Sequence, residues 1–238
     1  MPSDSSVFYA QPAVKDLFAL ELAALAPILG GIYGNFGLFV RPHDGAPATL
    51  PPHLLGTIID LTLDSARACS GRLRCAPAEL PIASESCKLV IAQHVLERVA
   101  DPAACAAEFA RILAPEGVAL VFGFNPVSLW RPWLAGKARG AALTLRPRSA
   151  QSWQMCLANQ GIETLQTRFL GAMSPWQRSD GSRGASGERR PFLGRVGGSW
   201  LLLARKRRSA MTPLRLRPAV RELGINPRLA PGAHRQCA

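Results

Sequence analysis

The sequence has few of the residues that build metal sites and disulfide scaffolds. It contains four histidines and six cysteines among 238 residues, and the cysteines show neither a CxxC pair nor the spacing of metal ligands. Several of them fall inside expected strands and helices, where a free thiol behaves as a small core residue. We therefore expect no zinc site, and we expect a reduced, cytoplasmic protein.

Two further signatures are missing. Residues 17–40 are apolar enough to raise the question of a membrane span, but Glu21, Pro27 and Asn35 interrupt them and glycines weaken the helix further. We expect no span here, and no secretory signal, because the chain begins with MPSDSS and shows no basic region followed by an apolar one. No GxGxxG follows any expected strand, which disfavours a nicotinamide-binding protein.

The chain has few acids and an uneven excess of basic residues. The net charge is +12, from 28 Lys and Arg against 16 Asp and Glu. Residues 205–238 hold nine of the basic residues and a single acid, Glu222, so most of the excess belongs to this end. Such a tail either contacts nucleic acid or another anionic surface, or is simply a solvated, disordered segment.

Strands and helices alternate along the chain. Apolar runs predict strands over 37–40, 56–63, 72–75, 87–92, 118–124, 163–170 and 199–206. Helical spacing, N-caps and stop signals predict helices over 12–29, from Asp101-Pro102 to Pro115, and over 149–159. This order favours a mostly parallel sheet with helices on both faces, and the last two strands should pair antiparallel because no helix separates them.

The domain organisation follows from these elements. We expect an N-terminal segment and helix over 1–31, with residues 1–11 disordered or loosely packed, and an α/β domain over 32–207. The Gly-, Ser- and Arg-rich residues 174–198 predict a mobile connection inside that domain, and 208–238 form the basic tail.

The central stretch, residues 80–130, resembles the second half of class I S-adenosylmethionine (SAM) dependent methyltransferases (methyltransferase type 11 domain). The phrases that carry the resemblance are LPI at 80–82, SCKLV at 86–90, HVLE at 94–97, DP at 101–102, RIL at 111–113 and PEG at 115–117. GFNP at 123–126 with SLW at 128–130, together with the C-terminal ARK, TPL and RQC phrases, is similar to the YafS-like branch.

The resemblance implies a Rossmann-like, seven-stranded sheet with an antiparallel last strand, and SAM bound across the carboxyl ends of the strands. Three features usually hold SAM: a glycine loop after the first strand, a carboxylate at the end of the second, and a polar residue after the third. The resemblance assigns these roles, and the lining of the pocket after the fourth strand, to six positions of this sequence: Val40, Arg41, Gly45, Asp64, Ala76 and His94. Asp60 is the alternative ribose carboxylate.

The methyl acceptor would face His94, after the fourth strand, and Asn125, after the fifth. Glu97 shares a turn face with His94 because of their three-residue spacing. Each has a structural alternative: His94 as a hydrogen-bonding core residue, Glu97 as a cap or an ion-pair partner of Arg98 or Arg111, and Asn125 as a turn residue before Pro126. Trp130, Arg131 and Trp133 either wall an aromatic pocket or form a lid that packs on the core.

The sequence departs from the family at two cofactor positions. Arg41-Pro42 stand where a glycine loop is expected, and Ala76 replaces the usual aspartate. The leading hypothesis is a SAM-dependent methyltransferase with an unidentified acceptor. The alternatives are a pseudo-methyltransferase that serves as a binding or scaffold protein, and a nucleic-acid-binding protein that acts through its tail.

Overall fold

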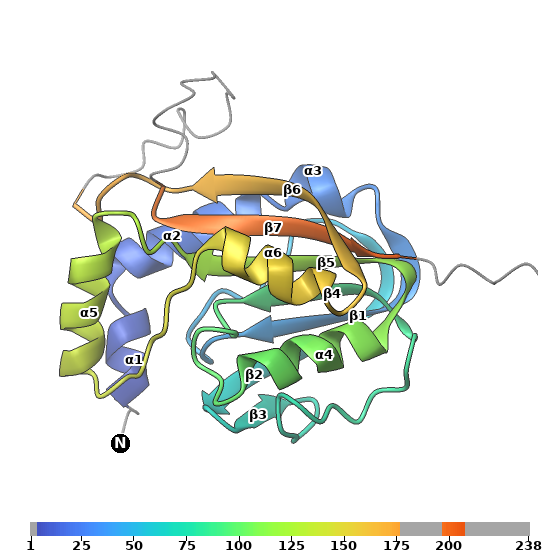
Figure 1. Cartoon of the computed structure of the whole chain (residues 1–238). Helices are drawn as coiled ribbons and strands as arrows, with labels where there is room; N and C mark the ends of the chain where they lie inside the picture. Colours follow the sequence, from blue (N-terminus) through green and yellow to red (C-terminus); the bar gives the residue numbers. More distant parts are fainter. Residues whose placement is uncertain (1–3, 177–196, 208–238) are drawn as a thin grey trace, which may run out of the picture. The chain divides into compact units, whose positions relative to one another are not determined.

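The computed structural model describes residues 4–176 and 197–207, which form a seven-stranded sheet with helices around it (Figure 1). The strand order is β3-β2-β1-β4-β5-β7-β6. The strands are β1 (Tyr33–Arg41), β2 (Leu54–Ser65), β3 (Ala68–Gly71), β4 (Cys87–Gln93), β5 (Leu113–Phe124), β6 (Ile162–Leu170) and β7 (Ser199–Lys206). The expected tail, and most of the expected mobile connection, lie outside the described residues.

The sheet confirms the predicted fold class. Strands β2, β1, β4 and β5 are parallel neighbours, and β7 runs antiparallel to both β5 and β6. One strand was placed wrongly: the third strand is Ala68–Gly71 and runs antiparallel to β2, while Cys75 takes part only in an isolated bridge with Cys69. A tight turn after Ser65 leaves no room for the crossover that a parallel neighbour requires.

The connection from β1 to β2 is unusual for a parallel pair. Parallel neighbours are usually joined through a crossover helix, yet residues 42–53 contain no helix. The carboxyl end of β1 therefore continues into an irregular loop, and no helix N-terminus faces a ligand there.

The N-terminal part is more ordered than the sequence predicted. Residues 1–11 were expected to be disordered or loosely packed, but α1 (Asp4–Tyr9) forms and the side chains of Phe8 and Tyr9 are buried. The single helix expected over 12–29 is divided into α2 (Pro12–Ala23) and α3 (Ala26–Leu29). Pro27 has no N–H to donate to a continuous helix and instead lies in the first turn of α3.

The remaining helices follow local signals, with one exception. Helix α4 (Pro102–Ile112) begins where predicted, because the Asp101 carboxylate accepts hydrogen bonds of 3.0 Å from the backbone N–H groups of Ala103 and Ala104. Ser149 caps α6 (Ala150–Ala158) in the same way. Helix α5 (Trp130–Gly140) was not predicted, since the sequence there was interpreted only as a pocket wall or lid.

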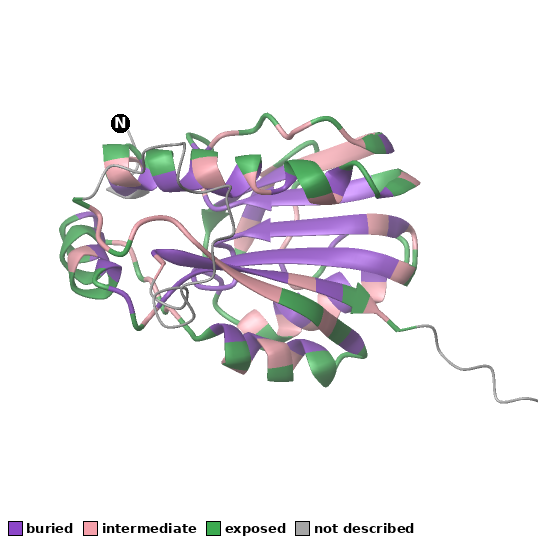
Figure 2. Cartoon of the chain, turned by 90° about the horizontal axis from the view of Figure 1, so that it is seen from above, coloured by how far each residue is buried: buried purple, intermediate pink, exposed green. Residues whose placement is uncertain are grey.

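Apolar side chains fill three clusters around the sheet. The largest packs α4 and α6 against one face, and a second packs the end of α2 and α3 against the other. The third lies at the carboxyl end of β5 and joins α1, α2 and α5. Figure 2 shows the central strands buried along most of their length. Within the described residues, no helix has both the length and the apolar character needed to cross a membrane.

Close packing between β5 and β7 gives a stability test. A Cβ added to Gly123 would lie 2.2 Å from a ring carbon of Trp200, its buried cross-strand partner, whereas a Cβ at exposed Gly136 of α5 would meet no atom within 4 Å. We expect Gly123→Ala to lower the free energy of unfolding by about 1–3 kcal/mol or more. Gly136→Ala should raise it by about 0.5–1 kcal/mol. Urea denaturation midpoints measure both, and equal midpoints for the two variants would contradict this packing.

Candidate functional site

The loop after β1 is organised by Arg41 rather than by glycine. The Arg41 guanidinium is nearly buried and donates to both carboxylate oxygens of Asp60 on β2, at 2.8 and 2.6 Å. Its remaining nitrogen donates to the carbonyl oxygens of Asp44 and Ala46. A bidentate arginine–carboxylate pair is directional and strong, so these contacts fix the path of residues 42–46.

A second arginine joins the ends of β1 and β2 to the loop after β4. Arg98 donates to the carbonyl oxygens of Pro42 and, at 3.3 Å, Leu63. The Tyr9 ring of α1 covers its guanidinium, with 5.5 Å between the guanidinium carbon and the ring centroid. Tyr9 also stacks on His43, at 5.4 Å between centroids. The N-terminal helix thus closes over the carboxyl ends of the first two strands.

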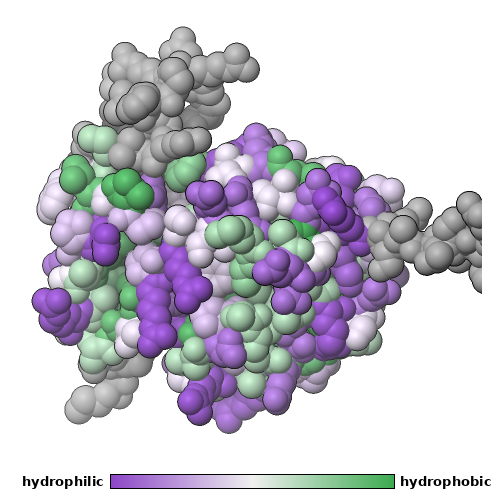
Figure 3. All heavy atoms as spheres, in the orientation of Figure 1, coloured by the Kyte–Doolittle hydropathy of each residue, from purple (hydrophilic) through white to green (hydrophobic). Residues whose placement is uncertain are grey.

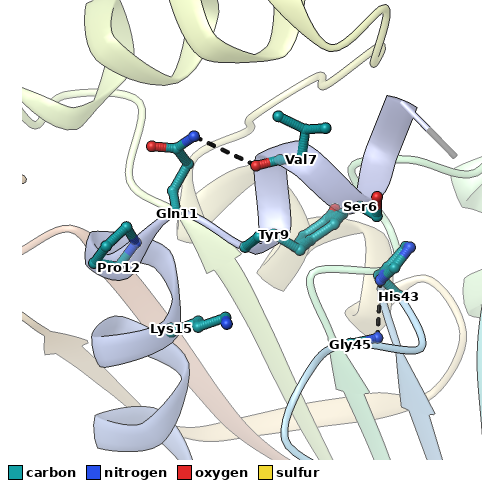
Figure 4. Close-up of a pocket in the computed structure, with 9 residues that line it drawn as sticks. Ser6, Val7, Tyr9, Gln11, Pro12, Lys15, His43 and Gly45 are labelled. Carbon is teal, nitrogen blue, oxygen red and sulfur yellow. Dashed lines mark hydrogen bonds between the residues drawn. The ribbon is translucent and has the colours of Figure 1, made fainter. Parts of the chain in front are cut away.

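A cavity of about 460 Å³ lies between α1, the start of α2 and the loop after β1 (Figure 4). Its lining residues come from these three segments: Ser6, Val7, Tyr9, Ala10, Gln11, Pro12, Lys15, His43 and Gly45. The buried Tyr9 hydroxyl has no hydrogen-bond partner among the described residues. The His43 Nδ1 atom accepts a hydrogen bond of 2.9 Å from the Gly45 N–H, which shapes the loop side of the cavity.

A buried charge cluster surrounds His94, the residue directly after β4. Its Nε2 atom lies 2.9 Å from a carboxylate oxygen of Glu21 on α2, and its Nδ1 atom lies 3.1 Å from one of Glu97. The Gln93 side chain donates to Glu21, and the Phe124 backbone N–H donates to Glu97. The contact between His94 and Glu97 confirms that they share one face of the turn.

The environment of His94 favours the imidazolium form. Burial alone would lower the pKa of His94, but the carboxylates of Glu21 and Glu97 outweigh burial and raise this pKa to about 9. The rings of Phe18 and Phe124 lie 4.9 and 3.9 Å from the imidazole, between centroids, and exclude water. Burial raises the pKa of Glu97, although its bonds to His94 and Phe124 act in the opposite direction.

The other predicted site residues are distributed along the carboxyl edge. Val40 is buried at the end of β1, and Gly45 lines the cavity. Asp64 is exposed near the end of β2 and accepts a 2.6 Å hydrogen bond from Ser70. Ala76 is half-buried and follows Cys75, beside β3.

Asn125 is buried in the turn after β5. Its side-chain nitrogen donates to the Gly197 carbonyl and its side-chain oxygen accepts from the Val127 N–H. Trp130 packs in the third apolar cluster, and its indole N–H donates to the Ala172 carbonyl. The neighbouring Trp133 is half-buried and Arg131 is exposed.

Three residues at this edge were missed from the sequence: Tyr9, Glu21 and Arg98. The sequence did carry a signal for Glu21, because it is the only charged residue within the apolar residues 17–29. In the structure its side chain is fully buried. A buried acid of this kind needs a partner. Nothing in the local sequence marks Tyr9 or Arg98, because their partners lie in distant segments.

The charge cluster predicts a pH-dependent stability. The folded pKa of His94, about 9, lies above its ordinary value of 6.5, so its contribution is complete below pH 6.5 and is lost as the pH rises through about 9. We expect Glu21→Gln to cost about 3–5 kcal/mol at neutral pH, because it removes one partner of a buried ion pair, and to flatten the decline between neutral pH and about pH 10.

Urea unfolding of both proteins across this pH range measures the difference. The buried cysteine thiols also titrate in the unfolded chain, but they contribute equally to both proteins. Parallel pH profiles for wild type and Glu21→Gln would contradict a protonated His94.

Comparisons with known proteins agree with the geometry at the level of the fold. Residues 57–121 match the family described as a methyltransferase domain. A search of curated protein sequences finds no match to the chain.

The solved structures that resemble this chain include several methyltransferases. A SAM-dependent methyltransferase from Thermotoga maritima superposes with a TM-score of 0.58 at 14% identity, covering 86% of this chain and 95% of its own. A complex of a methyltransferase with its activator from Haloferax volcanii gives 0.52 at 13% identity, with 86% and 98% covered. A Bacillus halodurans protein assigned as a methyltransferase gives 0.51 at 18% identity, with 79% and 99% covered. The chain therefore has the Rossmann-like fold of class I methyltransferases, and the domain match supports that family, while the YafS-like branch stays a prediction.

Proposed function

We propose that this chain is a SAM-dependent methyltransferase that acts on an unidentified acceptor. The class I fold and the domain match over 57–121 support the proposal. The observation that carries it is the cavity at the carboxyl end of β1, since open α/β sheets bind their ligands at this edge.

SAM does not fit the residues in the conformation described. No carboxylate lines the cavity, and Arg98 occupies the carbonyl oxygens of Pro42 and Leu63 at the ends of β1 and β2. The Tyr9 ring of α1 covers the Arg98 guanidinium on the side of the cavity. The proposal therefore requires α1 to move aside before the cofactor enters, and we derive no chemical step through it.

The proposed cofactor contacts are the six positions that the resemblance implied: Val40, Arg41, Gly45, Asp64, Ala76 and His94. One observation supports part of this set, since Gly45 lines the cavity. Asp64 does not line it, and its carboxylate accepts a hydrogen bond from Ser70.

The protonation state of His94 restricts the kinds of methyl acceptor that the site could use. An imidazolium has no free lone pair with which to accept a proton, so His94 is unsuited to act as a general base while Glu21 and Glu97 hold it. Methyl transfer from a sulfonium is an in-line displacement that mainly needs positioning. The proposed acceptor is therefore a group that is already nucleophilic at neutral pH, positioned beside Asn125.

Ligand-dependent thermal unfolding tests the methyltransferase proposal. At a ligand concentration of about 100 Kd, SAM or its demethylated product should raise Tm by about 5–10 °C, because binding adds about 2.7 kcal/mol to the folded state. Adenosine is the matched control, since it lacks the methionine portion. The absence of a shift and of calorimetric heat at millimolar SAM would contradict the proposal.

A specific observation favours a second candidate, a pseudo-methyltransferase that acts as a binding or scaffold protein. Arg41 and Asp60 form a bidentate pair where a glycine loop would approach SAM, and no helix follows β1. If the loop has lost its cofactor function, wild type should show no Tm shift with SAM.

Glycines at the loop separate the two candidates. For a pseudo-methyltransferase, the double variant Arg41→Gly/Pro42→Gly should gain a measurable shift with the demethylated product, despite a lower Tm of its own from the lost ion pair. Arg74→Gly, an exposed loop position, is the control and should gain nothing. If wild type binds and the double variant binds more weakly, the second candidate is contradicted.

A further inference from the structure

The segment that follows β5, beside the proposed acceptor position, has an excess of basic residues. Residues 117–162 contain five basic residues and no acid. All five are exposed, and none of them forms an ion pair within the described part of the chain. They are Arg131, Lys137 and Arg139 of α5, and Arg146 and Arg148 of the connection to α6.

This basic surface lies beside the proposed acceptor position. Helix α5 begins shortly after Asn125, and Trp130, Leu134 and Ala138 anchor it to the cluster that also contains Phe124. The Arg146 N–H donates to the Glu97 carbonyl oxygen at 3.0 Å, which holds the α5–α6 connection against the loop after β4. Figure 3 shows hydrophilic side chains over α5 and this connection.

Exposed acids and bases are spread unevenly along the carboxyl edge. On the proposed cofactor side, the exposed Asp44 and Asp64 after β1 and at the end of β2 partly balance exposed cations such as Arg67. The five basic residues follow β5, on the acceptor side, and residues 117–162 contain no acid. A negatively charged partner is therefore attracted more strongly to the acceptor side.

The arrangement fits an extended anion rather than a single phosphate. Helix α5 has 11 residues and is about 16 Å long, and its cations stand at positions 131, 137 and 139 along this length instead of converging on one point. Four of the five residues are arginines, whose planar guanidinium groups suit bidentate contacts with phosphate oxygens. Lys137 lies over the half-buried Trp133 ring, at 6.0 Å, so a cation and an aromatic surface occur together.

A membrane surface fits less well. Helices that lie on bilayers insert an apolar face between the lipids. The apolar face of α5 is already buried in the protein core by Trp130, Leu134 and Ala138, and is not available for insertion.

We propose that α5 and the α5–α6 connection bind the phosphodiester backbone of a nucleic acid, which is the acceptor of the methyltransferase. The role as acceptor rests on the proposed function, whereas the binding surface itself does not. Phosphate contacts hold the polyanion along the basic surface and present a base, whose ring nitrogens are already nucleophilic at neutral pH, to the site beside Asn125.

Salt-dependent binding of a labelled single-stranded RNA or DNA of about 20 nucleotides tests the proposal on the full-length chain. We expect the triple variant Arg131→Gln/Lys137→Gln/Arg139→Gln to bind at least about tenfold more weakly and to have a log–log salt slope shallower by about 2. The matched control is Arg67→Gln/Arg72→Gln/Arg74→Gln, which removes three exposed charges from the β2–β3 region and should leave affinity and slope unchanged. Circular dichroism confirms that both variants are folded.

Three outcomes overturn the inference. The first is an equal loss of nucleic-acid binding in both variants, and the second is unchanged binding in the α5 variant. The third is that the α5 substitutions weaken binding to vesicles of phosphatidylserine and phosphatidylcholine but not binding to nucleic acid. Residues 208–238 remain in every protein, so any contribution from the tail cancels. The SAM-dependent Tm shift is measured on the same samples, so a protein that binds nucleic acid without binding SAM refutes the methyltransferase proposal and leaves this surface intact.

Discussion

The imidazole of His94 links segments that are far apart in the chain, and the carboxyl end of the sheet depends on it. Its ring nitrogens contact Glu21 of α2 and Glu97, and Glu97 also accepts a hydrogen bond from the Phe124 backbone at the end of β5. Buried charges cost several kcal/mol each unless partners satisfy them. Here all four carboxylate oxygens have a partner, since Gln93 donates to the remaining oxygen of Glu21. The N-terminal helices are therefore held by electrostatic contacts as well as by apolar packing.

The two arginines at the same edge extend this arrangement toward β1 and β2. Arg41 binds Asp60 and the loop carbonyls, and Arg98 binds the carbonyl oxygens of Pro42 and Leu63. Polar groups at the strand ends are thus satisfied by the chain's own side chains. The choice between the two candidate functions depends on whether a bound ligand can replace these internal contacts of Arg41 and Arg98 with contacts of its own. The free energy of that exchange, rather than the fold, decides between an enzyme and a binding protein.

Part of the family resemblance has a structural explanation. Arg111 pairs with Glu108 and donates to the carbonyl oxygens of Leu80 and Ile82, while Glu108 accepts from the Leu80 N–H. The LPI and RIL phrases therefore fasten the segment before β4 to the end of α4, where these residues contribute to the fold. Asp101 in the DP phrase caps the same helix. Residues of this kind maintain the fold whether or not the chemistry is retained, which is why they support the fold more strongly than the activity.

The sequence by itself determined the elements that local physics encodes. Apolar runs placed the buried strands β4, β5 and β7, and the Asp101-Pro102 cap placed the start of α4, because these signals act between near neighbours in the chain. Only the tertiary structure decided that Tyr9 covers Arg98, that β3 reverses direction, and that Glu21 meets His94 across 73 positions of sequence. Such contacts depend on how distant segments pack, and neither periodicity nor capping reports on that. The same limit applies to the candidate site, since the sequence placed His94 and Asn125 directly after their strands but did not indicate that Tyr9, Glu21 and Arg98 pack against this edge.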